Sequence, residues 1–233
     1  MWELKQGDCI EHMKEMPDES IDLVFTSPPY NLGNSHHTGN KRHRAYNDDM
    51  PEVKYQSWQI EVLNECHRIL KQGGSVWYNH KNRIKKGCQI TPYEWLLKTD
   101  FIVKQEIVWV TRSQNFDKIR LYPWTERLYW LTKSPDIKMQ NVLNHHDVFD
   151  YTEWKPVGTK ESHTRAYPEK MVSDVLSCFP HAKTILDPFA GSGTTLVAAE
   201  KEGRDSIGIE LSEDYCKLIK ERMSEVQARL FYV

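Results

Sequence analysis

The chain has 233 residues, of which 39% are hydrophobic and 27% are charged, with a formal net charge of −2. This length supports one globular domain with a full core, and the composition is ordinary for a soluble protein. No apolar run approaches the ~20 residues of a membrane span, and the N-terminus does not resemble a signal peptide, so we expect a cytoplasmic protein without membrane contact. Because the net charge is slightly negative, any surface for nucleic acid must be a local basic patch.

The hydrophobic pattern predicts strands and helices that alternate along the chain. The predicted strands cover 21–26, 75–79, 101–110, 127–132, 184–186 and 206–210. The predicted helices cover 57–71, 168–179, 194–202 and 213–230. Gly73-Gly74 is predicted to end the first helix, and Pro168 to begin the second. This alternation predicts a mostly parallel sheet with helices on both faces.

The cysteines and histidines form no pattern typical of a metal site or of cysteine catalysis. The five cysteines are scattered without a C-x-x-C pair, and none follows a proline, as the nucleophile of a cytosine-C5 methyltransferase usually does. His36-His37 and His145-His146 have no carboxylate or cysteine at ligand spacing, and we interpret them as loop residues. The H-x-E and P-C-x-x-C signatures of a zinc deaminase do not occur in the sequence. We therefore predict no metal.

The first motif that carries chemistry is Thr26-Ser27-Pro28-Pro29-Tyr30-Asn31, where the predicted strand 21–26 ends. Two consecutive prolines remove two N–H donors, so the backbone there can only accept hydrogen bonds, and the Ser27 hydroxyl can accept as well. An amine held by such acceptors directs its nitrogen lone pair toward an electrophile. The ring of Tyr30 offers a face for stacking a base that has left the duplex. Taken alone, the motif is also compatible with a plain turn at the end of a strand.

The second motif, Leu186-Asp187-Pro188-Phe189-Ala190-Gly191-Ser192-Gly193-Thr194-Thr195, lies between a predicted strand and a predicted helix. A glycine-rich turn at such a place lets a ligand approach the backbone. Glu210 ends the next strand, and a carboxylate about 20 residues beyond the turn suits ribose hydroxyls. The turn lacks the lysine of a triphosphate-binding loop and the third glycine of G-x-G-x-x-G. Asp187 would repel a pyrophosphate but attract an α-ammonium group, which points to S-adenosylmethionine.

Together these motifs resemble the bacterial and phage DNA amino-methyltransferases over most of the chain. Ser27 to Tyr30 resembles that family's catalytic (D/N/S)-P-P-Y element, and Asp187 to Gly193 resembles its cofactor motif D-P-F-x-G-x-G. Gly7-Asp8 is similar to a motif near the cofactor adenine, and Arg68 to Gly74 is similar to the helix-end signature R-x-L-x-x-G-G. The catalytic motif precedes the cofactor motif, which is the permuted order of the β group. The resemblance implies a Rossmann-like α/β methyltransferase fold, circularly permuted, with a seven-stranded, mostly parallel sheet that has one antiparallel strand.

The resemblance also implies the residues of the site. Catalysis is expected to depend on Ser27, Pro28, Pro29 and Tyr30. S-adenosylmethionine is expected to contact Asp8, Asp187, Phe189, Ala190, Gly191, Gly193, Thr194 and Glu210. Further cofactor contacts are expected from His163 and Pro168, although the segment between them departs from the H-P-x-x-x-P often found in this group.

Double-stranded DNA is the expected partner, held by local basic patches. The expected phosphate contacts are Lys41, Arg42, Arg44, Lys81, Arg83, Arg112 and Arg120, and binding through them should weaken steeply with salt. We expect a single methyltransferase domain over 1–233, with a short target-recognition insertion around 134–162 and DNA-facing loops around 32–56 and 111–126. A homodimer and a separate restriction endonuclease are further partners that the resemblance allows.

The target base is suggested by the first residue of the catalytic motif. Ser27 resembles the cytosine-N4 enzymes, whereas the adenine-N6 enzymes mostly carry aspartate or asparagine there, so we favour cytosine N4 and keep adenine N6 as the alternative. A catalytically silent DNA-binding module of the same fold is a more distant alternative, against which the intact motifs argue. Methyltransferases that act on protein glutamine place their N-P-P-Y after the cofactor motif, and RNA as a substrate stays open.

Overall fold

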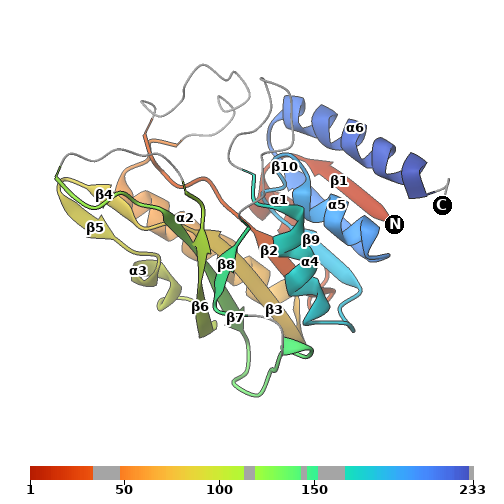
Figure 1. Cartoon of the computed structure of the whole chain (residues 1–233), viewed down its shortest axis with the longest axis horizontal. Coiled ribbons are helices and arrows are strands. Elements are labelled where there is room, and N and C mark those ends of the chain that lie inside the picture. Colours follow the sequence, from red (N-terminus) through yellow and green to blue (C-terminus); the bar gives the residue numbers. More distant parts are fainter. Residues whose placement is uncertain (34–47, 113–118, 143–145, 152–165, 231–233) are drawn as a thin grey trace.

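A mixed sheet of eight strands forms the centre of the molecule (Figure 1). The computed structural model describes residues 1–33, 48–112, 119–142, 146–151 and 166–230. Along the sheet the strands follow the order β1-β10-β9-β2-β3-β7-β6-β8, so strands from both ends of the chain lie side by side.

The elements have the following bounds. The strands of the main sheet are β1 (Trp2–Gln6), β2 (Ile21–Thr26), β3 (Leu70–His80), β6 (Ile102–Val110), β7 (Thr125–Thr132), β8 (Val148–Asp150), β9 (Thr184–Asp187) and β10 (Asp205–Glu210). The helices are α1 (Cys9–Lys14), α2 (Glu52–Ile69), α3 (Tyr93–Leu96), α4 (Glu169–Ser177), α5 (Thr194–Lys201) and α6 (Glu213–Leu230). Two short strands, β4 (Arg83–Lys85) and β5 (Cys88–Ile90), form a separate antiparallel hairpin.

Strand direction in the main sheet agrees with the sequence prediction, and strand number does not. β7 pairs antiparallel with both β3 and β6, and every other neighbouring pair is parallel. The predicted count of seven was wrong by one, because β8 adds an eighth strand beside β6. β8 has only three residues, which is too short to give a periodic hydrophobic signal.

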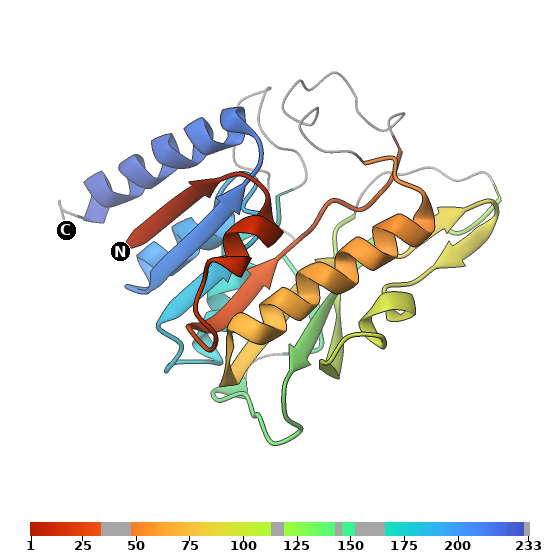
Figure 2. The ribbon, with the colours of Figure 1, turned by 180° about the vertical axis from the view of Figure 1, so that it is seen from behind.

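Helices cover both faces of the sheet, as the alternating pattern predicts. Figure 2 shows α1 and α2 in front of the sheet, whereas α4 and α5 lie in front of it in Figure 1. Side chains from α1, α2 and α3 share one buried apolar cluster with the sheet, and α4 contributes to a second cluster on the other face. The α5 and α6 helices pack on each other near β1 and β10. No helix in these described ranges is long and apolar enough to cross a membrane.

The region around α2 differs most from the prediction. The helix begins at Glu52, directly after Pro51, and ends at Ile69, so the last residues of the predicted 32–56 loop are helical. β3 starts at Leu70, and the prediction that Gly73-Gly74 ends the helix was wrong because both glycines lie in this strand. A Cβ at position 74 would lie 2.8 Å from the carbonyl oxygen of Asp22, so glycine is needed for the close approach of β3 to β2.

Candidate active site

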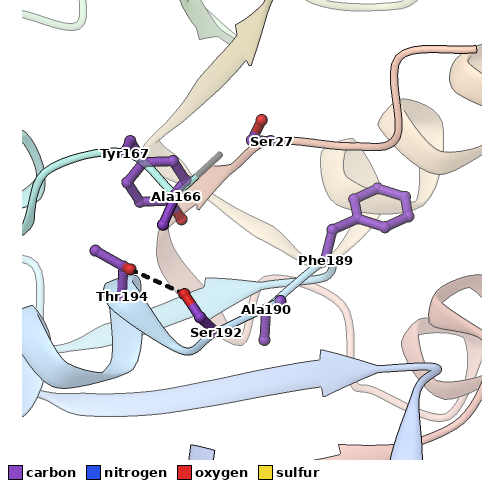
Figure 3. A pocket seen from close by; sticks show the side chains of 8 residues that line it. Ser27, Ala166, Tyr167, Phe189, Ala190, Ser192 and Thr194 are labelled. Atoms are coloured by element: carbon purple, nitrogen blue, oxygen red, sulfur yellow. Dashed lines mark hydrogen bonds between the residues drawn. The ribbon is translucent and has the colours of Figure 1, made fainter. Parts of the chain in front are cut away.

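The catalytic motif and the cofactor turn leave the sheet at the same edge. β2 and β9 are parallel neighbours, with Leu23 paired to Ile185 and Val24 to Leu186. The residues that follow their carboxyl ends therefore come together, which is where parallel α/β sheets bind ligands. Figure 3 shows Ser27, at the end of β2, across a hollow from Ser192 and Thr194 of the turn.

The turn after β9 has the left-handed backbone that its glycines permit. Gly191 has φ +52° and Gly193 has φ +81°, and Gly193 caps the first turn of α5. A Cβ on Gly193 would lie 2.9 Å from the Ile219 side chain of α6. The turn therefore brings the N-terminal N–H groups of α5 to the hollow, where they suit a carboxylate.

Asp187 is the centre of what we call the cofactor-side network. Its Oδ1 accepts from Thr26 Oγ1 at 2.8 Å and from the Phe189 N–H at 3.0 Å. Its Oδ2 accepts from the Tyr167 hydroxyl and from Thr195 Oγ1, each at 2.8 Å. The residue is 0% exposed, and burial raises the pKa of its carboxyl group while these donors act in the opposite sense. In this arrangement Asp187 joins β2, β9 and α5, and its contact with an α-ammonium group stays a prediction.

The other two predicted carboxylates also bond to the backbone. Glu210 is buried and accepts from the Gly191 N–H at 2.8 Å and the Ser212 N–H at 2.7 Å, so it supports the turn from β10. Asp8 caps α1 and accepts from the Ile10 N–H at 2.9 Å. The ribose contact of Glu210 and the adenine contact of Asp8 stay predictions.

Two hollows meet at Phe189, and together they suit a cofactor with an amino-acid end and a nucleoside end. The first is lined by Ser27, Ala166, Tyr167, Phe189, Ala190, Gly191, Ser192 and Thr194. The second is lined by Gly7, Asp8, Cys9, Trp58, Pro188, Phe189, Ile209 and Leu211. Hydroxyls and turn backbone surround the first hollow, whereas aromatic and aliphatic side chains beside one carboxylate surround the second. These residues fit S-adenosylmethionine.

The residue set that we call the substrate-side network comprises Ser27, Tyr30, Asn79 and Glu126. The Tyr30 hydroxyl lies 2.8 Å from Ser27 Oγ, 2.7 Å from Asn79 Oδ1 and 2.9 Å from Glu126 Oε2. Asn79 comes from β3 and Glu126 from β7. Burial and the negative charge of Glu126 raise the pKa of Tyr30 well above its usual range, so the phenol keeps its proton.

Two buried residues, Tyr55 and His80, support the catalytic motif from behind. The Tyr55 hydroxyl of α2 donates to the Pro29 carbonyl oxygen at 2.7 Å and lies 2.6 Å from His80 Nε2. The other ring nitrogen of His80, Nδ1, lies 2.9 Å from the backbone nitrogen and 2.8 Å from the carbonyl oxygen of Lys81. Burial lowers the pKa of His80 to about 3, so the ring is neutral.

The predicted DNA-contacting residues are in different environments. Arg83 is 4% exposed and makes a two-pronged ion pair with Glu52, at 2.9 and 2.7 Å, below the rings of Tyr55 and Trp95. Its charge is used inside the protein, and it does not form part of a phosphate-binding surface here. Arg112 is half exposed and pairs with Asp150 of β8 at 2.5 and 2.7 Å.

Lys81 and Arg120 are two more of the predicted DNA-contacting residues within the described part of the chain. Arg120 is exposed, and the Lys81 ammonium lies 5.9 Å from the centroid of the Tyr30 ring. Pro168 is buried at the start of α4, next to Ala166 and Tyr167 of the first hollow. Lys41, Arg42, Arg44 and His163 lie outside the described residues.

Several residues of the site were not found from the sequence. They are Thr26, Tyr55, Trp58, Asn79, His80, Glu126, Tyr167 and Thr195. Thr26 and Thr195 are members of the two motifs to which the sequence assigned no role, and their places beside Ser27 and Thr194 were the available signal. The others come from elements whose contact with the motifs depends on strand order.

Comparison with known proteins identifies the family. The family model N6_N4_Mtase, described as DNA methylase, matches residues 21–221. The chain is 28% identical to type II methyltransferase M.ScaI of Streptomyces caespitosus, over 98% of this chain and 83% of that protein. It is 29% identical to type II methyltransferase M.HinfI of Haemophilus influenzae, over 95% of this chain and 68% of that protein.

Solved structures show the same fold. The cytosine-N4-specific PvuII DNA methyltransferase superposes with a TM-score of 0.80 at 21% identity, over 95% of this chain and 86% of that one. A putative DNA modification methylase from Thermus thermophilus, complexed with S-adenosyl-L-methionine, superposes with a TM-score of 0.70 at 22% identity, over 97% and 94% of the two chains. The family match covers most of the chain and both motifs, so the protein belongs to the N6_N4_Mtase family of DNA methylases and is an S-adenosylmethionine-dependent DNA amino-methyltransferase.

Proposed function

We propose that the protein methylates the exocyclic N4 amine of cytosine at a specific sequence in double-stranded DNA, with adenine N6 as the alternative target. The observation that supports this choice is a serine at the first position of the catalytic motif, and this residue lines the first hollow. The cytosine-N4 description of the PvuII enzyme, which has the same fold, is consistent with it.

The residues around Ser27 define what happens to the amine. Tyr30 has one proton and two further acceptors, Asn79 and Glu126, so the Ser27 hydroxyl donates to Tyr30 and leaves its lone pairs for an amine hydrogen. The Pro28 carbonyl oxygen accepts the second amine hydrogen. With both hydrogens fixed, the nitrogen lone pair is directed at the electrophile, and positioning supplies most of the rate. The ring of Tyr30 lies against the flipped base.

The residues of the two hollows would hold S-adenosylmethionine. The turn Gly191 to Thr194 and the start of α5 would hold its amino-acid carboxylate, and Trp58, Phe189 and Asp8 would hold its adenosine. S-adenosylmethionine supplies a methyl group on a positively charged sulfur, which is already activated for transfer. The Asp187 and Glu210 carboxylates hold the turn in the shape that this placement requires.

DNA binds on the side of the sheet where the catalytic motif emerges. We assign phosphate contacts to Lys81, Arg112 and Arg120, together with the predicted contacts at 41–44, and we leave Arg83 out because of its buried pair with Glu52. The segment 134–162 serves target recognition within a single domain. A homodimer, a separate restriction endonuclease and a cytoplasmic location also belong to this proposal.

Methyl transfer to unmethylated genomic DNA, followed by digestion to nucleosides and mass spectrometry, tests the function. We expect N4-methylcytosine with the wild-type protein. Ser27→Ala should lower the yield by about 100-fold or more, because the amine loses an oriented acceptor. N6-methyladenine would move the assignment to the alternative base, and the absence of any methylated nucleoside would contradict DNA as the substrate.

A further inference from the structure

The Tyr30 hydroxyl has more oxygen neighbours than its one proton can serve. Asn79 Nδ2 donates to the Arg127 carbonyl oxygen at 3.0 Å, so Asn79 Oδ1 must be the atom that faces the phenol, and it can only accept. An ionised Glu126 can also only accept, at 2.9 Å. The phenol proton therefore serves one of these two acceptors at a time. With one more proton, on Glu126, all three contacts of the Tyr30 hydroxyl are satisfied.

We propose that Glu126 receives, through Ser27 and Tyr30, the proton that the target amine loses during methylation. This inference rests on the proposed function. Through Glu126, which lies near the start of β7, the antiparallel strand takes a direct part in the reaction.

The proton transfers balance in the following way. The amine nitrogen uses its lone pair to form the bond to the methyl carbon while the carbon–sulfur bond breaks and its electrons stay on sulfur, so the nitrogen becomes positive. Its surplus proton passes to Ser27 Oγ, the Ser27 proton passes to the Tyr30 oxygen, and the Tyr30 proton passes to Glu126 Oε2. The methylated amine is then neutral, Ser27 and Tyr30 are neutral again, and Glu126 is a carboxylic acid that returns its proton to water.

The neighbouring groups are unsuited to the same task. Asp187 is fully buried and already accepts four hydrogen bonds. His80 packs against the Tyr30 ring, at 4.6 Å between centroids, but burial lowers its pKa to about 3, so it does not hold an extra proton near neutral pH. Glu126 is only partly buried, so its proton can leave to solvent.

Two basic residues lie near the substrate-side network. The Lys81 ammonium lies over the Tyr30 ring, 5.9 Å from its centroid. Arg127, the next residue on β7, pairs through Nε with Glu106 of β6 at 2.8 Å. Trp109 of β6 is opposite Glu126 in the sheet and adds no charge.

The test compares Glu126→Gln with Glu106→Gln in single-turnover methyl transfer over a range of pH. Glu106 is a matched control because it lies on the adjacent strand, is also partly buried, and pairs with Arg127 instead of Tyr30. We expect Glu126→Gln to slow transfer by about 10- to 100-fold and to remove the fall in rate on the acid side. Glu106→Gln should stay within about twofold of wild type and keep that acid limb, since a partly exposed ion pair contributes little.

Further measurements separate proton transfer from structural damage. Tyr30→Phe keeps the ring but cuts the relay, so it should match Glu126→Gln, and the double variant should be no slower than either single variant. Binding of S-adenosylmethionine and DNA, followed by fluorescence, should be unchanged in Glu126→Gln, and a pH-indicator dye should show slower proton release. If Glu126→Gln does not fold, Tyr30→Phe carries the same comparison.

The failures of the two proposals are distinguishable. A wild-type protein that methylates no nucleoside overturns the proposed function, and the relay with it. A wild-type protein that methylates DNA, with a Glu126→Gln variant that matches Glu106→Gln in rate and pH profile, overturns the relay alone. Additive losses in the double variant would overturn it as well.

Discussion

The two sides of the catalytic motif handle a carboxylate in opposite ways. On the cofactor side, Asp187 is fully buried, and three hydroxyls and one N–H surround its two oxygens. On the substrate side, the single proton of Tyr30 is shared between Asn79 and Glu126. A carboxylate with a full set of donors fixes geometry, whereas one that competes for a proton can take up another. One network therefore holds the site in place, and the other is free to change its protonation.

The largest expected effect comes from Asp187→Asn. Asparagine has one oxygen and one NH₂ group where the carboxylate has two oxygens. The groups around Asp187 donate to the carboxylate, and the Phe189 N–H cannot become an acceptor for the new NH₂ group. We expect the free energy of unfolding to fall by about 2–4 kcal/mol and S-adenosylmethionine to bind more weakly, because the turn is no longer fixed. Urea unfolding and a cofactor titration measure the two effects.

Asp174→Asn is the matched control for this change. Asp174 also accepts from a tyrosine, with the Tyr151 hydroxyl at 2.9 Å, but it lies on α4 away from the hollows and pairs with an exposed lysine. The control should cost less than about 1 kcal/mol and leave cofactor affinity unchanged. If Asp187→Asn behaved like Asp174→Asn, the positioning role of Asp187 would be wrong.

His80 gives the next largest effect, through pH. Burial lowers the pKa of the folded protein's His80 to about 3, whereas the unfolded chain's histidine titrates near ~6.5. Below ~6.5 the unfolded state binds a proton that the folded state does not, so this contribution to stability is full above ~6.5 and is lost as the pH falls. Between about pH 6.5 and pH 5 it should lower the unfolding free energy by about 2 kcal/mol.

Urea unfolding of wild type, His80→Gln and His181→Gln at the two pH values tests this dependence. The glutamine amide does not titrate, so His80→Gln should lose about 2 kcal/mol less on acidification than wild type does. His181 is exposed, and its variant should keep the wild-type response. Equal losses in all three proteins would contradict the buried neutral histidine.

Sequence reasoning found the parts of this molecule that are local in the chain. The strand 21–26, the turn Asp187 to Thr194 and the alternation of the longer strands and helices follow from short motifs and periodicity, whereas β1, α1, β4, β5, α3 and β8 were not predicted. Pro51 was an available signal for the start of α2, because proline is common at the beginning of a helix.

The parts that were missed depend on contacts between distant residues. Thr26 and Asp187 are 161 positions apart, and Tyr30 and Glu126 are 96 apart. Arg83 seemed to belong to a basic surface patch, yet Glu52 and two aromatic rings enclose it, and no local pattern encodes that arrangement. Gly74 was assigned to a helix end for a similar reason. A glycine that ends a helix and a glycine that lets β3 approach β2 closely look the same in the sequence.

The smallest effect, and the most specific, is expected for Tyr55→Phe. Tyr55 and Tyr78 are both fully buried and both donate one hydrogen bond, Tyr55 to the Pro29 carbonyl and Tyr78 to Gln59 Oε1, each at 2.7 Å. Removing either hydroxyl should lower the unfolding free energy by about 1 kcal/mol. Only Tyr55 touches the catalytic motif, so only Tyr55→Phe should lower kcat, by about 5- to 10-fold, with cofactor affinity unchanged.

Tyr78→Phe is therefore the control that separates lost stability from lost positioning. Equal stability losses with unequal kcat would show that the Pro29 carbonyl must be held in place for the neighbouring acceptors to receive the amine. Equal kcat values would mean that the two consecutive prolines hold the Pro29 carbonyl in place without Tyr55. The difference between the two sides of the catalytic motif would then depend on Asp187 and Tyr30 alone. Urea unfolding and steady-state kinetics on both variants decide between these outcomes, because a change in folding moves both proteins and a change in positioning moves one.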